Sequence, residues 1–156
     1  ALNIELWLGH VMDQEQLIWQ GDELGPGHEN VVAGFHMNRY DLNASLNWNI
    51  GTRHELRVKL EALGFDADAP TAWRVGADGR GVRSNDPVQA FSFRNMGFQL
   101  RYRYELAPLS NLYVVYGRGG FGYDPYAAGA FEQFGDAFSL RNDEQLVVKL
   151  AYRFEL

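Results

Sequence analysis

The chain has 156 residues, of which 46% are hydrophobic, with a mean hydropathy of -0.32 and a formal net charge of -6. That length fits a single domain over residues 1–156, and no apolar run approaches the roughly 18 residues that a membrane-spanning helix needs. The absence of cysteine excludes thiol catalysis, Cys-ligated zinc and disulfides. A negative charge without a Lys/Arg cluster argues against nucleic-acid binding. Because the sequence opens without a signal peptide pattern, we expect a mature form or an internal piece.

The first 40 residues give a mixed pattern. Apolar side chains alternate from Ile4 to Leu8, and a second apolar group follows at residues 17–19. The pattern predicts either one long strand with a β-bulge or two strands with a turn near Asp13. Residues 31–40 are ambiguous and could hold a further strand.

Residues 41–50 show the first regular alternation. Leu, Ala, Trp and Ile at the even positions alternate with Asp, Asn and Ser at the odd positions, as in a strand with one apolar face. A short turn at residues 51–54 leads to a second alternating strand over residues 55–62. The Asn-rich face suits a hydrogen-bonded or water-filled lumen better than a soluble core, where unpartnered amides are costly.

Further strands follow in the second half of the chain. Residues 98–106 alternate Phe, Leu and Tyr with Gln, Arg and Glu, and residues 111–121 continue as a strand whose apolar face the pattern does not define. Residues 144–156 are apolar at every even position after the first and largely polar at the odd ones. This last strand is longer than the usual five or six residues and is close to the roughly 9–11 that cross a bilayer at a tilt.

Connection lengths alternate along the chain. The connections at 51–54 and 107–110 are short, whereas those at 21–30, 66–90 and 122–143 are long and rich in Gly, Asp, Pro and Asn. Short periplasmic turns opposite long loops, with the C-terminus on the short-turn side, are typical of transmembrane barrels. We therefore predict an all-β, antiparallel up-and-down transmembrane β-barrel of about six to eight strands in a bacterial outer membrane. Closed membrane barrels have about eight strands or more, so either the ambiguous regions supply two or the chain is the C-terminal part of a larger barrel.

The charged face of these strands is expected to face the lumen, because Lys or Arg facing lipid at the membrane midplane costs roughly 2–4 kcal/mol. The predicted lumen-facing charged residues are Arg57, Lys59, Glu61, Arg101, Arg103, Glu105, Lys149, Arg153 and Glu155. The predicted lipid-facing residues are Leu42, Leu46, Trp48, Leu56, Val58, Leu60, Phe98, Leu100, Tyr102, Tyr104, Leu146, Val148, Leu150, Tyr152 and Phe154. The charged residues could form ion pairs that stiffen the interior, which we favour, or line a pore.

Three stretches carry a family resemblance. They are Asp-Leu-Asn-Ala-Ser-Leu-Asn-Trp-Asn-Ile-Gly at 41–51 with His-Glu-Leu-Arg at 54–57, the segment 97–116, and Gln-Leu-Val-Val-Lys-Leu-Ala-Tyr-Arg-Phe at 145–154. Together they resemble the C-terminal segment of a large bacterial family of unknown function, in which a module similar to family-9 carbohydrate-binding domains precedes a long predicted outer-membrane barrel. The resemblance covers roughly residues 21–156. It implies that the chain forms the closing strands of a bigger barrel, and it carries over no catalytic residue.

No catalytic, cofactor-binding or metal-binding residue is predicted. The four histidines, His10, His28, His36 and His54, lack metal-ligand spacing, and Ser45, Ser92, Ser110 and Ser139 lack a nucleophile-elbow setting. Residues 76–81 with Asp66, Asp68 and Asp86 could offer oxygen ligands to calcium, but they match no calcium signature, and an exposed acidic loop is favoured. The glycines at 117–120 are interpreted as barrel kinks rather than a phosphate site.

Three functions remain open. The leading one is a non-enzymatic outer-membrane barrel with structural, translocation or complex-forming roles, whose partners are outer-membrane lipid and other membrane subunits. The second is an outer-membrane enzyme or glycan-processing protein that acts through its long loops or a missing N-terminal module. The third is a soluble lipocalin-like ligand-binding barrel, in which the apolar face would point inward.

Overall fold

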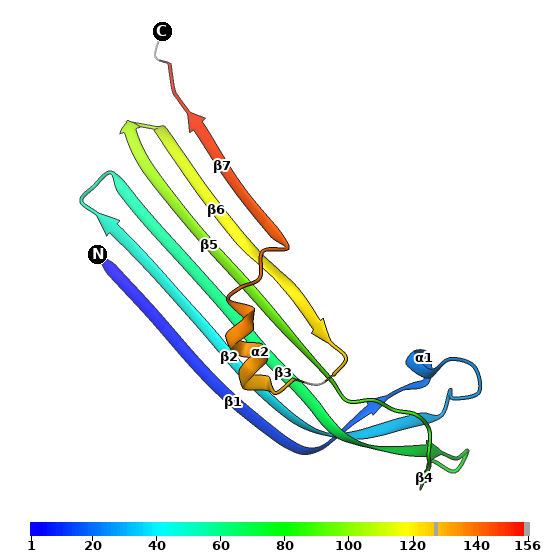
Figure 1. Ribbon diagram of the computed structural model, residues 1–156. Coiled ribbons are helices and arrows are strands. Elements are labelled where there is room, and N and C mark those ends of the chain that lie inside the picture. Colours follow the sequence, from blue (N-terminus) through cyan, green and yellow to red (C-terminus); the bar gives the residue numbers. More distant parts are fainter. Residues whose placement is uncertain (127, 155–156) are drawn as a thin grey trace.

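The computed structural model describes residues 1–126 and 128–154 and consists of one antiparallel sheet of long strands (Figure 1). The strands are β1 (Leu2–Trp19), β2 (Val31–Ile50), β3 (His54–Val75), β4 (Gly81–Arg83), β5 (Phe91–Ala107), β6 (Ser110–Asp124) and β7 (Asp143–Ala151). Two helices, α1 (Gly21–Leu24) and α2 (Ala130–Ala137), lie in the long connections. The strand order is β1-β2-β3-β5-β6-β7, and the short β4 pairs only with the end of β3.

The predicted all-β antiparallel class is confirmed, and most strands extend beyond their predicted ends. Residues 31–40 belong to β2, which pairs with β3 from Val31 opposite Arg74 to Ile50 opposite His54. The prediction of a loop over residues 66–90 is therefore wrong for its first part. Residues 66–75 lack apolar alternation, but their backbone continues the hydrogen-bonded ladder that β2 offers, and a ladder can hold polar and small residues.

The connections near the short-turn end agree with the predictions. In the N-terminal region, the first of the two predicted alternatives is found: residues 2–19 form one strand, with a register irregularity between Asp13 and Gln16. The β2–β3 turn contains Gly51 at φ 62°, and the β5–β6 turn contains Leu109 at φ 60°. A positive φ favours glycine, so Leu109 is the more strained of the two turn residues.

The sheet is open. Strands β1 and β7 form its two edges, and over the described residues they do not pair with each other. The closed barrel therefore stays a prediction. Of the helices within the described residues, neither α1 nor α2 is long and apolar enough to cross a membrane.

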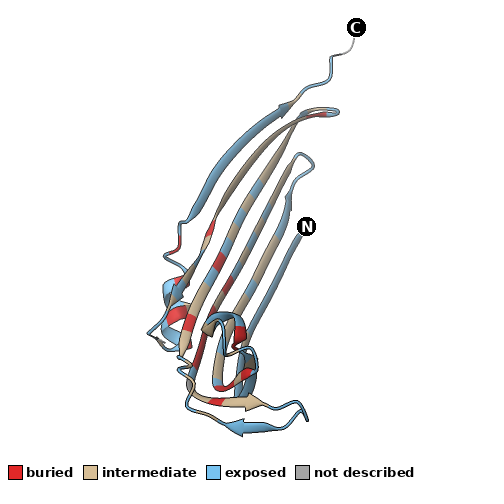
Figure 2. Cartoon of the chain, turned by 90° about the vertical axis from the view of Figure 1, so that its right-hand side faces the viewer, coloured by how far each residue is buried: buried red, intermediate tan, exposed pale blue. Residues whose placement is uncertain are grey.

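Buried residues concentrate at the long-loop end of the sheet (Figure 2). One small core contains Phe35 and Phe65, and a second joins Ala62 and Met96 to the segment that contains α2. The half of the sheet nearer the short turns contains almost no buried residue (Figure 2). This half of the sheet therefore has no core of its own, and both of its faces are available for contacts with other molecules.

Candidate functional site

The register assigns each strand residue to one of two faces, because directly opposed residues in a sheet point to the same side. One row runs across all the long strands, with each residue opposite the next: Ile4, Leu46, Val58, Leu100, Tyr116 and Leu146. Parallel rows on this face make it apolar from β1 to β7. Side chains one position along each strand form the opposite face.

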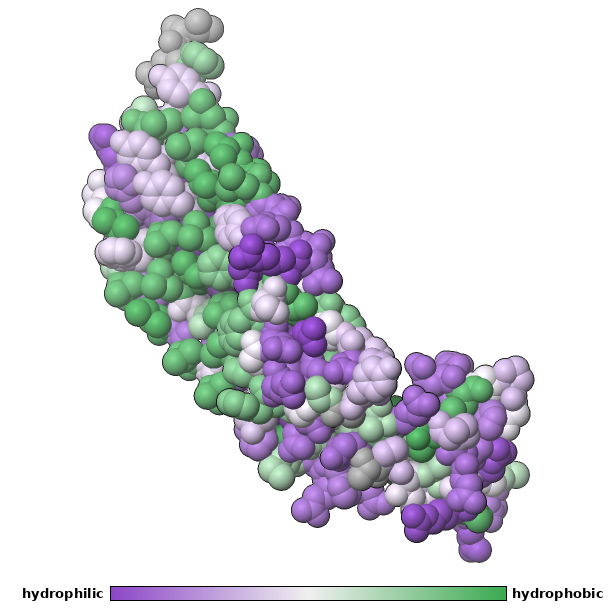
Figure 3. All heavy atoms as spheres, viewed as in Figure 1, coloured by the Kyte–Doolittle hydropathy of each residue, from purple (hydrophilic) through white to green (hydrophobic). Residues whose placement is uncertain are grey.

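The first of these, the apolar face, collects the residues predicted to face lipid. It comprises Leu42, Leu46, Trp48, Leu56, Val58, Leu60, Phe98, Leu100, Tyr102, Tyr104, Leu146, Val148 and Leu150 within the strands. Tyr152 and Phe154 follow the end of β7, with their ring centroids 4.9 Å apart. Figure 3 shows this surface as a continuous hydrophobic area over the short-turn half of the sheet. Its side chains are exposed on the edge strands, where Leu146 is 66% and Ile4 62% exposed, and half-buried on the central strands.

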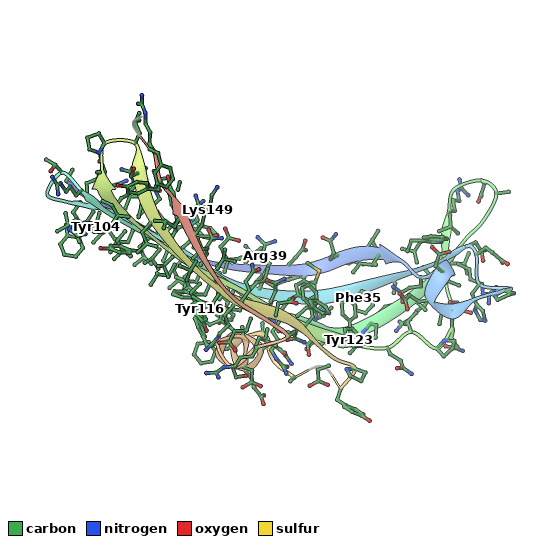
Figure 4. The ribbon with its side chains drawn as sticks, turned by 90° about the horizontal axis from the view of Figure 1, so that it is seen from above. Phe35, Arg39, Tyr104, Tyr116, Tyr123 and Lys149 are labelled. Atoms are coloured by element: carbon green, nitrogen blue, oxygen red, sulfur yellow. The ribbon has the colours of Figure 1, made fainter. Side chains whose placement is uncertain are left out.

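The opposite side, the charged face, carries the residues predicted to face the lumen. Within strands these are Arg57, Lys59, Glu61, Arg101, Arg103, Glu105 and Lys149. Arg153 follows β7, where its backbone N–H donates to Ser110 Oγ at 3.0 Å, and Glu155 lies outside the described residues. In Figure 4, Arg39 and Lys149 project from one side of the sheet and Tyr116 from the other.

Ion pairs satisfy only part of the charged face. Glu55 pairs with Arg57 and with Arg103, whose Nε lies 3.0 Å from Glu55 Oε2. Arg57 stands directly opposite Arg101 in the register, which is unfavourable for like charges without solvent or a counter-charge. Within the described part of the chain, neither Lys59 nor Arg101 has an ion pair. The arrangement therefore calls for water or anions over this face rather than a dry core.

At its long-loop end the same face becomes aromatic. Phe65 stacks on Phe93 with centroids 4.5 Å apart, and Phe91 meets the fully buried Phe35 edge-on at 5.6 Å. The sequence did not predict this cluster, because Phe35 lies in the ambiguous region and Phe65, Phe91 and Phe93 lie just outside the predicted strands. The alternation of Phe91 and Phe93 was the available signal.

Helix α2 packs on the apolar face, at the end away from the short turns. Gly64 of β3 lies directly beneath it, where a Cβ atom would come within 2.2 Å of Phe134 N and 2.3 Å of Ala130 O. The sequence predicted a long loop here. The Phe spacing at 131, 134 and 138 was the helical signal that a Gly- and Asp-rich context concealed.

Polar contacts fasten the helix to the sheet. Asp66 Oδ1 accepts a hydrogen bond from Ala130 N at 2.6 Å, which satisfies a free N–H of the first turn. Gln133, only 1% exposed, donates to Ser92 Oγ at 3.0 Å and accepts from Arg94 Nη1 at 2.8 Å. These bonds place one side of α2 on the polar continuation of the sheet.

Aromatic groups flank the apolar face at both ends. At the short-turn end, His54 Nδ1 lies 2.6 Å from the Tyr102 hydroxyl and its ring stacks on Tyr104 at 4.6 Å. At the other end, Tyr40 stacks on His10 at 4.2 Å and meets Phe131 of α2 edge-on at 5.5 Å. We call these two groups the short-turn rim and the helix rim.

The rims set the height of the apolar face. From Tyr40 to Trp48, β2 advances by about 27 Å at roughly 3.4 Å per residue. At the strand tilt of roughly 35–45° found in membrane barrels, this corresponds to about 20 Å of height between Cα atoms. With the side chains of both rims added, the height is close to the roughly 25 Å apolar band of those barrels.

No protein-family model matches the chain, and comparisons with curated proteins and with solved structures return no match.

A polar cluster joins two of the long connections beyond the helix rim. Asp86 accepts from Arg74 Nε at 2.9 Å and from Ser84 Oγ at 2.6 Å, and its Oδ1 lies 2.8 Å from His28 Nδ1. The hydrogen bond from Arg74, followed by that from Ser84, holds the pKa of Asp86 well below its ordinary value. We call this group the loop clasp.

The clasp also bears on the calcium alternative. Asp86 is engaged by Arg74, and Asp66 lies under α2, so these two carboxylates do not converge on one point. Among the residues that the structure describes, no group of three or more His, Cys, Asp or Glu side chains is placed to hold a metal ion.

Proposed function

We propose that this sheet is part of the wall of a closed outer-membrane β-barrel, with its apolar face in lipid and its charged face toward a hydrated lumen. The protein then acts as a non-enzymatic structural, translocation or complex-forming component of the outer membrane. One observation carries the proposal: an uncovered apolar face runs across every long strand and ends at an aromatic rim on both sides.

The distribution of charge supports the orientation. Between the rims, Lys and Arg occupy the charged face, whereas Arg94 and Arg118 appear on the apolar face only near α2. Arg118 shares a row with Leu60 and Phe98, and within the described strands the rows of this face nearer the short-turn rim carry no Lys or Arg. Aromatic side chains are enriched at membrane–water interfaces, where their rings tolerate both environments.

The open edges supply the argument for closure. Strands β1 and β7 leave a row of backbone N–H and C=O groups without partners inside the apolar band, over the residues that the structure describes. In hydrocarbon each such group costs several kcal/mol, so only a closed barrel is viable there. The path β1-β2-β3-β5-β6-β7 contains six long strands, fewer than the eight of the smallest closed membrane barrels. Additional strands therefore complete the wall, in agreement with the resemblance to the closing part of a longer barrel.

The proposal is tested by adjacent probes on the two faces. The chain has no cysteine, so Leu46→Cys and Ser45→Cys each introduce a single nitroxide-labelling site on opposite faces of β2. In protein taken from membranes into lipid bilayers, we expect the label at 46 to be accessible to oxygen dissolved in lipid. The label at 45 should instead be accessible to a water-soluble nickel relaxant.

Fractionation provides the second readout. We expect the native protein in the outer-membrane fraction, extractable only with detergent, with heat-modifiable migration on gels. A water-soluble protein whose label at 46 is shielded from both relaxants would overturn the proposal, because the apolar face would then line the inside of a soluble ligand-binding barrel.

A further inference from the structure

A hollow lies on the apolar face beside α2. It separates the helix rim from the apolar rows nearer the short turns, which we call the band. Its lining consists of Leu60, Met96, Phe98, Tyr116, Arg118 and Phe138, and its volume is about 310 Å³. Leu60 and Phe98 belong to the predicted lipid-facing set, so the hollow is continuous with the band. Its size is at the lower end of ordinary ligand sites.

Helix α2, beside the hollow, has one apolar flank and one polar flank. Phe134 packs toward Ala62 and Met96, and Phe138 lines the hollow, so this flank of α2 faces the band. Gln133 bonds to Ser92 and Arg94 on the other flank, and helical spacing puts the exposed Glu132 and Asp136 on that polar side. An amphipathic helix so oriented fits the boundary between acyl chains and headgroups.

Arg118 is the charged member of the lining. Its Nη2 donates to the Phe138 carbonyl, and its Nε is buried without a hydrogen-bond partner among the described residues. Glu144 is opposite Arg118 in the register, but its carboxylate accepts from the Tyr116 hydroxyl at 2.5 Å and forms no ion pair with Arg118 in the described part of the chain.

We propose that this hollow is a binding site for one anionic membrane lipid, with part of an acyl chain in the hollow and the headgroup phosphate against Arg118. The inference rests on the proposed function, because it requires the helix rim to lie at headgroup level. Charge complementarity selects the occupant: an apolar hollow bordered by a guanidinium with an unused donor fits an acyl chain joined to a phosphate. A neutral peptide or a second copy of the apolar face would leave that donor without a partner.

Native mass spectrometry of the detergent-extracted, full-length protein tests the site. Phosphatidylglycerol and phosphatidylcholine with identical acyl chains are added in a neutral detergent, and bound lipid is counted per protein. We expect one phosphatidylglycerol to be retained at concentrations where phosphatidylcholine is not. Arg118→Gln should weaken that binding by about tenfold or more, the effect of losing one charge-assisted hydrogen bond, and Arg118→Lys should keep most of it.

Lys149→Gln is the matched control, since it removes one positive charge from the charged face of the neighbouring strand. Equal retention of the two lipids, unchanged binding in Arg118→Gln, or an equal loss in Lys149→Gln would each overturn the lipid site while leaving the membrane proposal intact. A water-soluble protein, by contrast, would remove both. Heat-modifiable migration of each variant shows that it has folded, and the comparison of the two lipids on the unsubstituted protein keeps the test decisive where Arg118→Gln fails to fold.

Discussion

Gly64 determines at the residue scale whether α2 can lie on the sheet. Its missing side chain leaves room for the helix backbone, with Phe134 N only 2.2 Å from the position a Cβ would take. Backbone atoms of a helix cannot yield as a flexible side chain can, so any larger residue must push the helix away. The helix rim and the hollow beside it both depend on this one glycine.

We therefore expect Gly64→Ala to destabilise the seated helix by about 1–3 kcal/mol, the usual cost of overpacking. Gly97→Ala is the matched control, because a Cβ at Gly97 on β5 would meet no atom within 4 Å, and its effect should stay within about 0.5 kcal/mol. Tryptic cleavage after Arg141, the exposed residue just beyond α2, should accelerate in the first variant alone. Equal cleavage in both variants would show that α2 does not need the glycine.

Asp86 governs the loop clasp at the same scale. Its pKa is lowered first by the hydrogen bond from Arg74, so its carboxylate stabilises the folded clasp when ionised. An acid whose pKa is lowered by folding stabilises the folded state fully above its ordinary pKa, about 3.9 for Asp. That stability is lost as the pH falls through the lower pKa of the folded state. The contribution of the Asp86 carboxylate to the clasp should therefore be unchanged between about pH 5 and 7 and should be lost only in stronger acid.

Asp86→Asn should open the clasp even at neutral pH, because the amide loses the charge that holds Arg74. Hydrogen exchange of the amides in residues 21–30 and 76–90 is the measurement, and faster exchange is expected in both segments, which the clasp joins. Asp78→Asn is the control: Asp78 lies in the same connection, but its exposed carboxylate contacts its neighbour Arg80, through a 3.7 Å ion pair and a 3.1 Å hydrogen bond from the Arg80 backbone N–H, and does not join two connections. If Asp86→Asn exchanged no faster than this control, the clasp would contribute nothing to loop order.

At the scale of elements, strand alternation predicted well and context-dependent pairing did not. Residues 41–50 and 55–62 carry their face assignment in their own period of two, and the structure opposes them residue by residue. Residues 66–75 become a strand only because β2 provides a partner ladder, which no local pattern records. Helix α2 needed both its Phe spacing and the gap above Gly64, and only the spacing is visible in the sequence.

The candidate sites show the same division. The two faces follow from alternation, so the charged and apolar residues could be sorted from the sequence alone. The hollow could not be predicted, since Leu60, Met96 and Tyr116 come from three strands and meet only through the register. The loop clasp likewise joins His28 to Asp86, two residues that lie 58 positions apart in the chain.

At the scale of the whole molecule, the apolar band suits a lipid environment, whereas the unpaired backbone groups of the two open edges do not. Further strands that pair with both edges would remove this conflict. The proposed function places the apolar face in hydrocarbon, where an unpaired strand edge is not tolerated. The clasp, α1 and β4 lie at one end and the tight turns of β2–β3 and β5–β6 at the other, while the β6–β7 connection folds α2 back over the sheet (Figure 1). Under the proposed function, this asymmetry corresponds to a barrel wall inserted in one direction, with long loops outside and short turns in the periplasm.

Closure by additional strands predicts protection at both edges. In the native protein in membranes, amides of β1 and β7 should exchange as slowly as those of the central β3, because every edge group has a partner in a closed barrel. The doubly substituted Leu6→Cys and Val148→Cys protein tests in the same preparation whether the two edges meet, since Leu6 lies on β1 and Val148 on β7. We expect no disulfide between positions 6 and 148, within one chain or between two copies, because other strands separate them. A disulfide within the chain would mean that these strands close on themselves, and fast exchange at both edges would mean that no barrel forms.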